Sequence, residues 1–106
     1  MSWIPALALQ HLQRESRMLA ELFAIQRIRA GDRRLLTLLQ WIGQSHGQVN
    51  SHGGRLSLSE LNLTHRSLAD ICGLTRVTVT KLLSRLRAEG RLVAIGDSDL
   101  LIPSQP

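Results

Sequence analysis

The stretch HRSLADICGLTRVTVTKLLS, from His65 to Ser84, carries the strongest structural signal in this 106-residue chain. Thr64 precedes it and suits the N-cap of a short helix, because its hydroxyl can accept a hydrogen bond from a backbone N–H of the first turn. The apolar residues of that helix share one face: Leu68, Ile71 and Cys72. Gly73 follows, and glycine readily adopts the positive φ of a tight turn. This half of the stretch predicts a short helix closed by a sharp turn.

A second helix is predicted directly after the turn, with Thr75 as its N-cap. Its inner face has the i, i+3, i+4, i+7 spacing of a buried helical stripe. The residues of this stripe are Val79, Leu82, Leu83 and Leu86. Small Ala69 allows the two helices to approach closely, and Leu74 fills the turn between them. Together these positions predict a helix-turn-helix.

The opposite face of the second helix is small, polar and basic. It consists of Val77, Thr80, Lys81, Ser84 and Ala88, with Arg76 in the first turn. No carboxylate occurs from Thr75 to Ala88, and a DNA major groove flanked by phosphates is complementary to such a surface. Arg76 could donate a bidentate pair to guanine, Val77 could contact a thymine methyl, and Lys81 could reach a base or a phosphate. The competing interpretation is a solvated surface without a partner.

A β-hairpin is expected after this helix. Gly90 ends the helical pattern, and residues 91–95 and 100–102 are apolar-rich stretches typical of strands. Residues 96–99, Gly-Asp-Ser-Asp, have the composition of a turn. A helix-turn-helix followed by a hairpin predicts a winged helix, so we expect a mainly α fold with a small β wing.

The N-terminal part is predicted to form a long helix over residues 5–29. Its apolar positions fall in a narrow sector at 100° per residue: Ala8, Leu12, Leu19 and Phe23, with Leu22 on the flank. The helix either packs on its own domain or serves dimerisation through Leu12, Leu19, Leu22 and Phe23. Its length exceeds what a small domain needs, which favours dimerisation. We therefore divide the chain into a helix, residues 1–30, and a winged helix-turn-helix, residues 31–106.

Between these units the pattern predicts a helix, a loop and a short extended piece. Gly31 is expected to break the first helix, and Asp32 to cap a core helix over residues 33–44. The glycine-rich segment 45–55 is predicted to be a loop, and its two histidines, His46 and His52, are interpreted as solvated rather than metal-binding. Alternating leucines over residues 56–63 predict the extended piece.

Composition narrows the function classes. Thirteen Lys and Arg against eight Asp and Glu give a net charge of +5, and twelve of the thirteen are Arg. Such a surplus indicates a polyanionic partner, although a ribosome or an acidic protein would also fit. Cys72 is the only cysteine, which excludes an intramolecular disulfide and a multi-thiolate metal site. With no signal peptide, membrane span or catalytic motif, we expect a cytoplasmic protein that is not an enzyme and has no membrane partner.

Residues 32–103 resemble the DNA-binding domain of the Crp/Fnr family of bacterial transcription regulators. The similarity is carried by LTHRSLADICGLTRVTVTKLLSRLRAEGRL, from Leu63 to Leu92. It implies a homodimer on a palindromic operator in double-stranded DNA, with helix 75–88 of each copy in a major groove. The residues it implies for operator reading are Thr75, Arg76, Val77, Thr80 and Lys81; we add Ser84, and His65 for a phosphate. Val77 stands where many members carry a glutamate, and Lys81 stands where an arginine is usual.

Family members usually carry a β-roll sensor before the dimerisation helix, and residues 5–29 resemble the end of that helix. We therefore expect a chain without the sensor, either a natural short form or a fragment, with no cofactor and no small-molecule effector. Contact with RNA polymerase is a further implication. One alternative is a protein-interaction module that pairs with a full-length relative through residues 5–29 and antagonises it. Another is nonspecific nucleoid or RNA binding, but the intact face with Arg76 and Lys81 favours specific DNA binding.

Overall fold

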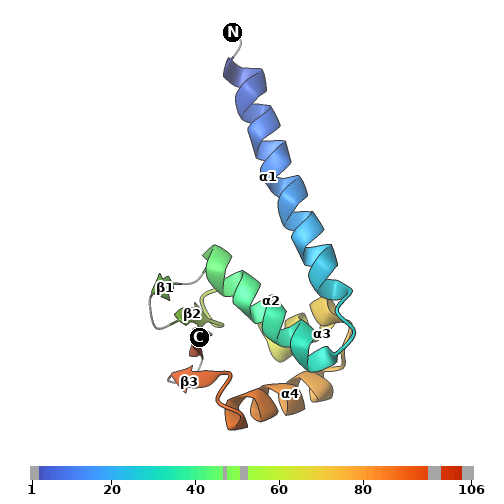
Figure 1. The fold of residues 1–106 in the computed structure, drawn as a ribbon, viewed down its shortest axis with the longest axis vertical. Helices are drawn as coiled ribbons and strands as arrows, with labels where there is room; N and C mark the ends of the chain where they lie inside the picture. Colours follow the sequence, from blue (N-terminus) through green and yellow to red (C-terminus); the bar gives the residue numbers. More distant parts are fainter. Residues whose placement is uncertain (1–2, 47, 51–52, 96–98, 104–106) are drawn as a thin grey trace.

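The computed structural model describes residues 3–46, 48–50, 53–95 and 99–103. In chain order its elements are α1 (Trp3–Gln26), α2 (Gly31–His46), β1 (Gln48–Asn50), β2 (Gly53–Ser57), α3 (His65–Cys72), α4 (Arg76–Ala88), β3 (Val93–Ile95) and β4 (Asp99–Pro103). Figure 1 shows α2, α3, α4 and the sheet gathered into one body, from which α1 projects. The molecule is accordingly elongated, with extents of 55 × 30 × 28 Å. The predicted mainly α fold with a small β wing is confirmed.

Helix α2 lies at the centre of the core, as its apolar pattern predicts. Five of its side chains are buried: Leu35, Leu36, Leu38, Leu39 and Ile42. The helix contacts α1, α3, α4 and β2, so the elements of the body share one hydrophobic cluster. Burial of this apolar surface is the main favourable contribution that holds α3 and α4 against α2.

The helix-turn-helix forms as its sequence predicts. Thr64 caps α3 by accepting a hydrogen bond from the Ser67 N–H (3.0 Å), and Thr75 caps α4 in the same way from Thr78 (3.1 Å). Gly73 has φ 66° and ψ 37°, the left-handed conformation that ends α3. The stripe on α4 faces the core, where Val79, Leu83 and Leu86 are buried and Leu82 packs against their cluster.

The sheet corrects two sequence predictions. It has four antiparallel strands in the order β1-β2-β4-β3, so the segment predicted to be a loop over residues 45–55 contains β1 and most of β2. The glycines of this segment suggested a loop, but Gly53 allows β2 to lie close to β4. A Cβ on Gly53 would lie 2.2 Å from the carbonyl oxygen of Ile102 on β4. The predicted extended piece ends early, because the chain turns over residues 58–62; Leu58 and Leu61 of this turn, and Leu63 after it, still pack on the core.

The wing strands form where they were expected, with small shifts of their bounds. Strand β3 begins at Val93 rather than Arg91, and β4 runs from Asp99 to Pro103. Of the turn predicted over residues 96–99, residues 96–98 lie outside the described residues, as does His52, and Asp99 belongs to β4. The two strands pair in antiparallel register, Val93 with Leu101 and Ile95 with Asp99.

Helix α1 ends three residues earlier than predicted, and Gly31 is not its breaker. The backbone tightens after Gln26, where the Ile28 N–H donates to the Ile25 carbonyl (3.1 Å). Gly31 instead opens α2, where a Cβ would lie 3.4 Å from the Leu74 side chain in the turn of the helix-turn-helix. Asp32 is therefore in the first turn of α2 rather than at its cap, and its carboxylate accepts from the Arg33 N–H (2.8 Å).

Three contacts attach the C-terminal end of α1 to the body. Ile25 is buried in the core; Trp41 Nε1 donates to Glu21 Oε2 (2.7 Å); and Gln26 Nε2 donates to the Ile71 carbonyl (3.0 Å). From Pro5 to Arg17 every residue of α1 is exposed. Within the described residues no helix combines the length and apolarity needed to cross a membrane.

Candidate DNA interface

The predicted reading face of α4 is exposed along its length. The residues from the sequence prediction that lie on it are all accessible: Thr75, Arg76, Val77, Thr80, Lys81 and Ser84. Val77 is 59% exposed although it is apolar, whereas Val79, two residues further on, is fully buried. The helix is thus divided into a core side and an accessible side, and the accessible side holds Arg76 and Lys81 without a carboxylate.

The Thr75 hydroxyl is used mainly within the protein. It accepts from the Thr78 N–H and donates to Thr78 Oγ1 at 2.8 Å, so its only proton is committed to the cap. Thr75 therefore stabilises the start of α4 and can offer a DNA group one remaining lone pair. The first turn of a helix leaves backbone N–H groups without a helical acceptor, so the exposed start of α4 favours anions.

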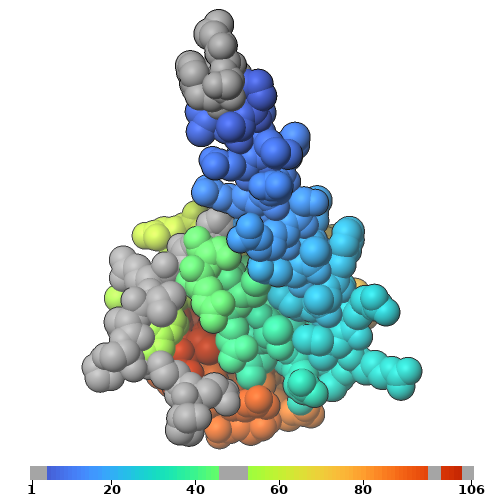
Figure 2. Space-filling view, turned by 45° about the horizontal axis from the view of Figure 1, so that its top comes forward, coloured from blue at the N-terminus to red at the C-terminus, as the bar shows by residue number. Residues whose placement is uncertain are grey.

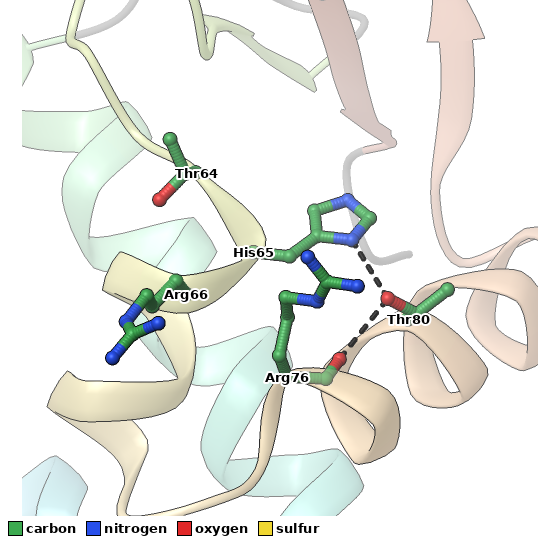
Figure 3. A pocket seen from close by; sticks show the side chains of 5 residues that line it. All are labelled: Thr64, His65, Arg66, Arg76 and Thr80. Atoms are coloured by element: carbon green, nitrogen blue, oxygen red, sulfur yellow. Dashed lines mark hydrogen bonds between the residues drawn. The ribbon is translucent and has the colours of Figure 1, made fainter.

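A hollow of about 450 Å³ lies between the N-terminal ends of α3 and α4 (Figure 3). Its lining is Thr64, His65, Arg66, Arg76 and Thr80, which supplies two guanidinium groups, an imidazole and two hydroxyls but no carboxylate. Guanidinium groups bind phosphate oxygens through paired N–H donors. The hollow thus brings two predicted residues of α4, Arg76 and Thr80, together with His65 of α3.

Arg66 is a member of this lining that sequence reasoning missed. It is exposed at the second position of α3. The available signal was its place in the first turn of a helix, where a cation beside free N–H groups suits a phosphate.

His65 is bonded to α4 through Thr80. His65 Nδ1 lies 2.8 Å from Thr80 Oγ1, and Thr80 Oγ1 donates to the Arg76 carbonyl at 3.0 Å (Figure 3). A threonine hydroxyl has one proton, and here it is given to Arg76. His65 Nδ1 therefore carries a proton and donates it to Thr80, which leaves Nε2 as the ring atom free to meet DNA.

On the other flank of α4, an ion pair joins the helix to α2. Arg85 Nη2 lies 3.0 Å from Asp32 Oδ2, and Arg85 Nε lies 3.6 Å from Glu89 Oε1. The backbone N–H of Arg33 and then the Arg85 guanidinium hold the pKa of Asp32 below its ordinary value. Arg85 follows Lys81 by one helical turn, so a second cation, also missed from the sequence, borders the reading face.

The acidic residue at the base of the wing is paired. Arg55 Nη2 and Nε donate to Asp99 Oδ2 at 2.6 and 3.0 Å across strands β2 and β4. Arg55, and then the Ser57 hydroxyl, lower the pKa of Asp99. Asp97, the other acid expected at the wing tip, lies outside the described residues. The negative charge of Asp99 is thus balanced by the positive charge of Arg55.

The residues predicted for dimerisation fall into two groups. Leu12, Leu19 and Phe23 are 61%, 54% and 59% exposed, whereas Leu22 is partly buried and packs against the core. Figure 2 shows the dark blue N-terminal part of α1 standing clear of the body. The side of α1 that contacts the body, around Ile25, differs from the side that carries the exposed residues. We call Leu12, Leu19 and Phe23 the α1 seam.

Two sequence comparisons relate this chain to bacterial regulatory proteins. A family model described as a Crp-like helix-turn-helix domain matches residues 33–104. The regulatory protein CysR of Synechococcus elongatus is 39% identical over 83 residues, which cover 78% of this chain and 40% of CysR. The chain therefore spans about two fifths of that relative's length.

Solved structures show the same fold. A CRP-family transcriptional regulator from Thermus thermophilus superposes with a TM-score of 0.71 at 20% identity, covering 91% of this chain and 47% of that one. A CooA mutant from Carboxydothermus hydrogenoformans has a TM-score of 0.71 at 24% identity, covering 94% and 46%. The family model, which spans both helices and the wing, shows that the chain belongs to the Crp-like helix-turn-helix family of DNA-binding transcription regulators.

Proposed function

We propose that this chain is a sequence-specific binder of double-stranded DNA that regulates transcription as a homodimer, with α4 of each copy in a major groove. The observation that carries the proposal is the exposed, carboxylate-free face of α4 beside a hollow lined by two arginines and a histidine. A major groove offers base acceptors at its floor and phosphates along its rims. The α4 face offers donors and apolar groups to the bases, and the basic side chains beside it face the phosphates on the rims.

The roles follow from position on the helix. Arg76, exposed in the first turn of α4, donates two N–H groups to guanine O6 and N7. Val77 contacts a thymine methyl, and Lys81 and Ser84 reach bases or phosphates along the same face. Arg66 holds a phosphate on one rim, and His65 joins it when its ring is protonated, because Nε2 then carries an N–H group to donate. On the other rim, Arg85 reaches a phosphate with the guanidinium N–H groups that its ion pairs with Asp32 and Glu89 leave over.

The homodimer forms along α1 in this proposal. The α1 seam exposes three large apolar side chains at spacings of seven and four residues, which are typical of a short coiled coil. Two copies pairing their seams would remove these side chains from water. Residues 1–30 then serve assembly and residues 31–106 serve DNA binding. A palindromic operator follows, because a two-fold dimer presents two identical reading helices.

Selection of bound duplexes from a random DNA library at about 150 mM salt tests this function. We expect a palindrome whose half-sites lie one helical turn apart. Arg76→Ala, run in parallel, is expected to relax one position of each half-site. Enrichment of no sequence, with binding that salt abolishes uniformly, would overturn the proposal.

A second candidate function rests on the same exposed seam. The chain could pair with a full-length relative through α1 and antagonise it, as a protein-interaction module. A mixture with such a relative, followed by sedimentation and by operator binding of the relative, separates the two functions. Formation of mixed dimers that lose operator affinity, together with no operator for the chain alone, would favour the antagonist.

The DNA-binding proposal extends to three points of context. These are a cytoplasmic location, contact with RNA polymerase and binding that requires no small-molecule effector. Selection in buffer without added metabolites tests the effector point directly, because a requirement would leave the library unenriched until a metabolite is supplied.

A further inference from the structure

We propose that His65 is a positioning residue that sets base specificity through Thr80, so that Thr80 reads DNA with its methyl group rather than with its hydroxyl. The inference rests on the proposed function. It concerns one contact within the reading face of α4, and it begins from the hydrogen bonds that Thr80 makes inside the protein.

The hydroxyl of Thr80 has little capacity left for DNA. Its proton goes to the Arg76 carbonyl (3.0 Å), and one of its two lone pairs accepts from His65 Nδ1 (2.8 Å). Thr80 can therefore donate nothing to guanine O6, to a purine N7 or to thymine O4. A hydroxyl that is free in solution could turn to meet any of these acceptors, but two bonds hold this one.

The same two bonds orient the methyl group. Figure 3 shows the Thr80 hydroxyl turned toward His65 and the Arg76 carbonyl, with the methyl on the far side. Thr80 is exposed on the α4 face, three residues after Val77, so both residues present apolar groups on neighbouring turns. In a major groove the apolar group that such a surface meets is the thymine C5 methyl. The inferred half-site therefore contains a thymine opposite Thr80, next to the one read by Val77.

The contact is tested by removing the thymine methyl from the DNA and the Thr80 methyl from the protein, separately and together. Each thymine of the operator recovered for the unaltered protein is replaced singly by deoxyuridine, which lacks only the methyl, and the Kd is measured by fluorescence anisotropy. The protein variants are Thr80→Ser, which keeps the hydroxyl and loses the methyl, and Thr80→Val, which does the reverse. Burial of one methyl predicts a loss of about fourfold at a single thymine. That loss is expected in the unaltered protein, and it is expected to vanish in Thr80→Ser. It is also expected in Thr80→Val, because valine carries a methyl on both branches of Cβ and needs no hydroxyl bond to place one of them.

The role of His65 is tested by a matched pair of variants. The substitution His65→Asn places an amide N–H near the position of Nδ1, whereas His65→Leu removes the donor. The fourfold deoxyuridine effect is expected to persist in His65→Asn and to fall by at least about half in His65→Leu. Heteronuclear NMR of the free protein is expected to show the proton of the neutral ring on Nδ1.

The outcomes separate this inference from the function on which it rests. Recovery of no operator by the unaltered protein overturns both. An operator whose deoxyuridine effects are unchanged in Thr80→Ser, or lost in Thr80→Val, leaves sequence-specific binding intact and overturns methyl reading. A full effect in His65→Leu, or a neutral ring protonated on Nε2, overturns the positioning role of His65.

Discussion

Gly73 holds the turn of the helix-turn-helix through its backbone conformation alone. Its φ is 66°, and a Cβ built there meets no atom within 4 Å, so space is not the constraint. Gly73→Ala is expected to cost about 1 kcal/mol, because L-residues are disfavoured in the left-handed region. Thermal unfolding followed by circular dichroism should show a Tm lower by roughly 4–8 °C.

A matched control for this variant is Gly54→Ala. A Cβ at Gly54 also meets no atom within 4 Å, but its backbone is outside the left-handed region. We expect its Tm to stay within about 2 °C of the unaltered protein. Equal losses in the two variants would contradict the conformational argument.

Substitutions of Arg76 test whether a single side chain reads a base. Arg76→Ala is expected to weaken operator binding by roughly 1–3 kcal/mol and to relax a single position in each half-site. Arg76→Lys keeps the charge but lacks the bidentate fork, so it should relax the same position with a smaller loss. Competition binding against a set of operator variants measures both effects. Arg14→Ala, on exposed α1, serves as the charge control, and an equal loss on every DNA sequence would refute base reading by Arg76.

At the scale of elements, the Asp32–Arg85 pair ties α4 to α2. The pKa of Asp32 is lowered in the folded chain from its ordinary value of 3.8, first by the Arg33 N–H and then by Arg85. A carboxylate with a lowered pKa stabilises the fold above its unfolded pKa, and that contribution is lost as the pH falls through the folded pKa. Asp32→Asn is therefore expected to be less stable than the unaltered protein at pH 7.

The acid dependence of this variant provides the check. Urea midpoints measured from pH 7 downward should converge for Asp32→Asn and the unaltered protein as the pH falls through the lowered pKa of folded Asp32, where this carboxylate loses its charge. Asp99→Asn removes the other acid with a lowered pKa and acts as a comparison on the sheet rather than on α4. A gap between Asp32→Asn and the unaltered protein that stays constant as the pH falls would show that the carboxylate charge is not its cause.

The helices were predictable because their signals are local. Thr64, Gly73 and Thr75 mark the ends of α3 and α4 within a few residues, and the caps form as expected. Strands β1 and β2 were not predictable in this way, because β2 is stabilised by pairing with β4, more than forty residues later in the chain. Gly53 and Gly54 look like loop residues in sequence and are strand residues in the sheet.

The candidate interface was predictable in part for the same reason. The face of α4 follows from helical periodicity, so its exposure could be expected. The hydrogen bond between His65 and Thr80, and the places of Arg66 and Arg85 on the flanks, depend on how α2 and α3 pack against α4. Spacing along the chain carries no information about those contacts.

For the whole molecule, the seam on α1 predicts the state of assembly. Leu19→Glu is expected to give a monomer in sedimentation equilibrium, because it places a charge at the centre of the paired seam. Affinity for a palindromic operator should fall toward that for a single half-site, while binding to the half-site itself is retained.

Leu7→Glu is the matched control for the seam. Leu7 is 55% exposed, as is Leu19 at 54%, but it lies about 120–160° around the helix from the seam residues. We expect this variant to remain dimeric. A dimer in Leu19→Glu, or monomers in both variants, would place the assembly surface elsewhere.

The attachment of α1 has a mechanical consequence for operator spacing. Only residues 27–30 join α1 to α2, and Arg34 Nη1 holds the Ile28 carbonyl (2.8 Å) while Gln26 holds Ile71 (Figure 1). The junction has little slack, so α1 and the body turn together as one lever. In the proposed dimer, two such levers cross along their seams. Moving the crossing point by one heptad, about 10 Å, would change the separation of the two reading helices without altering α4. The length of DNA between the half-sites of the proposed operator would then be set by residues that do not contact it.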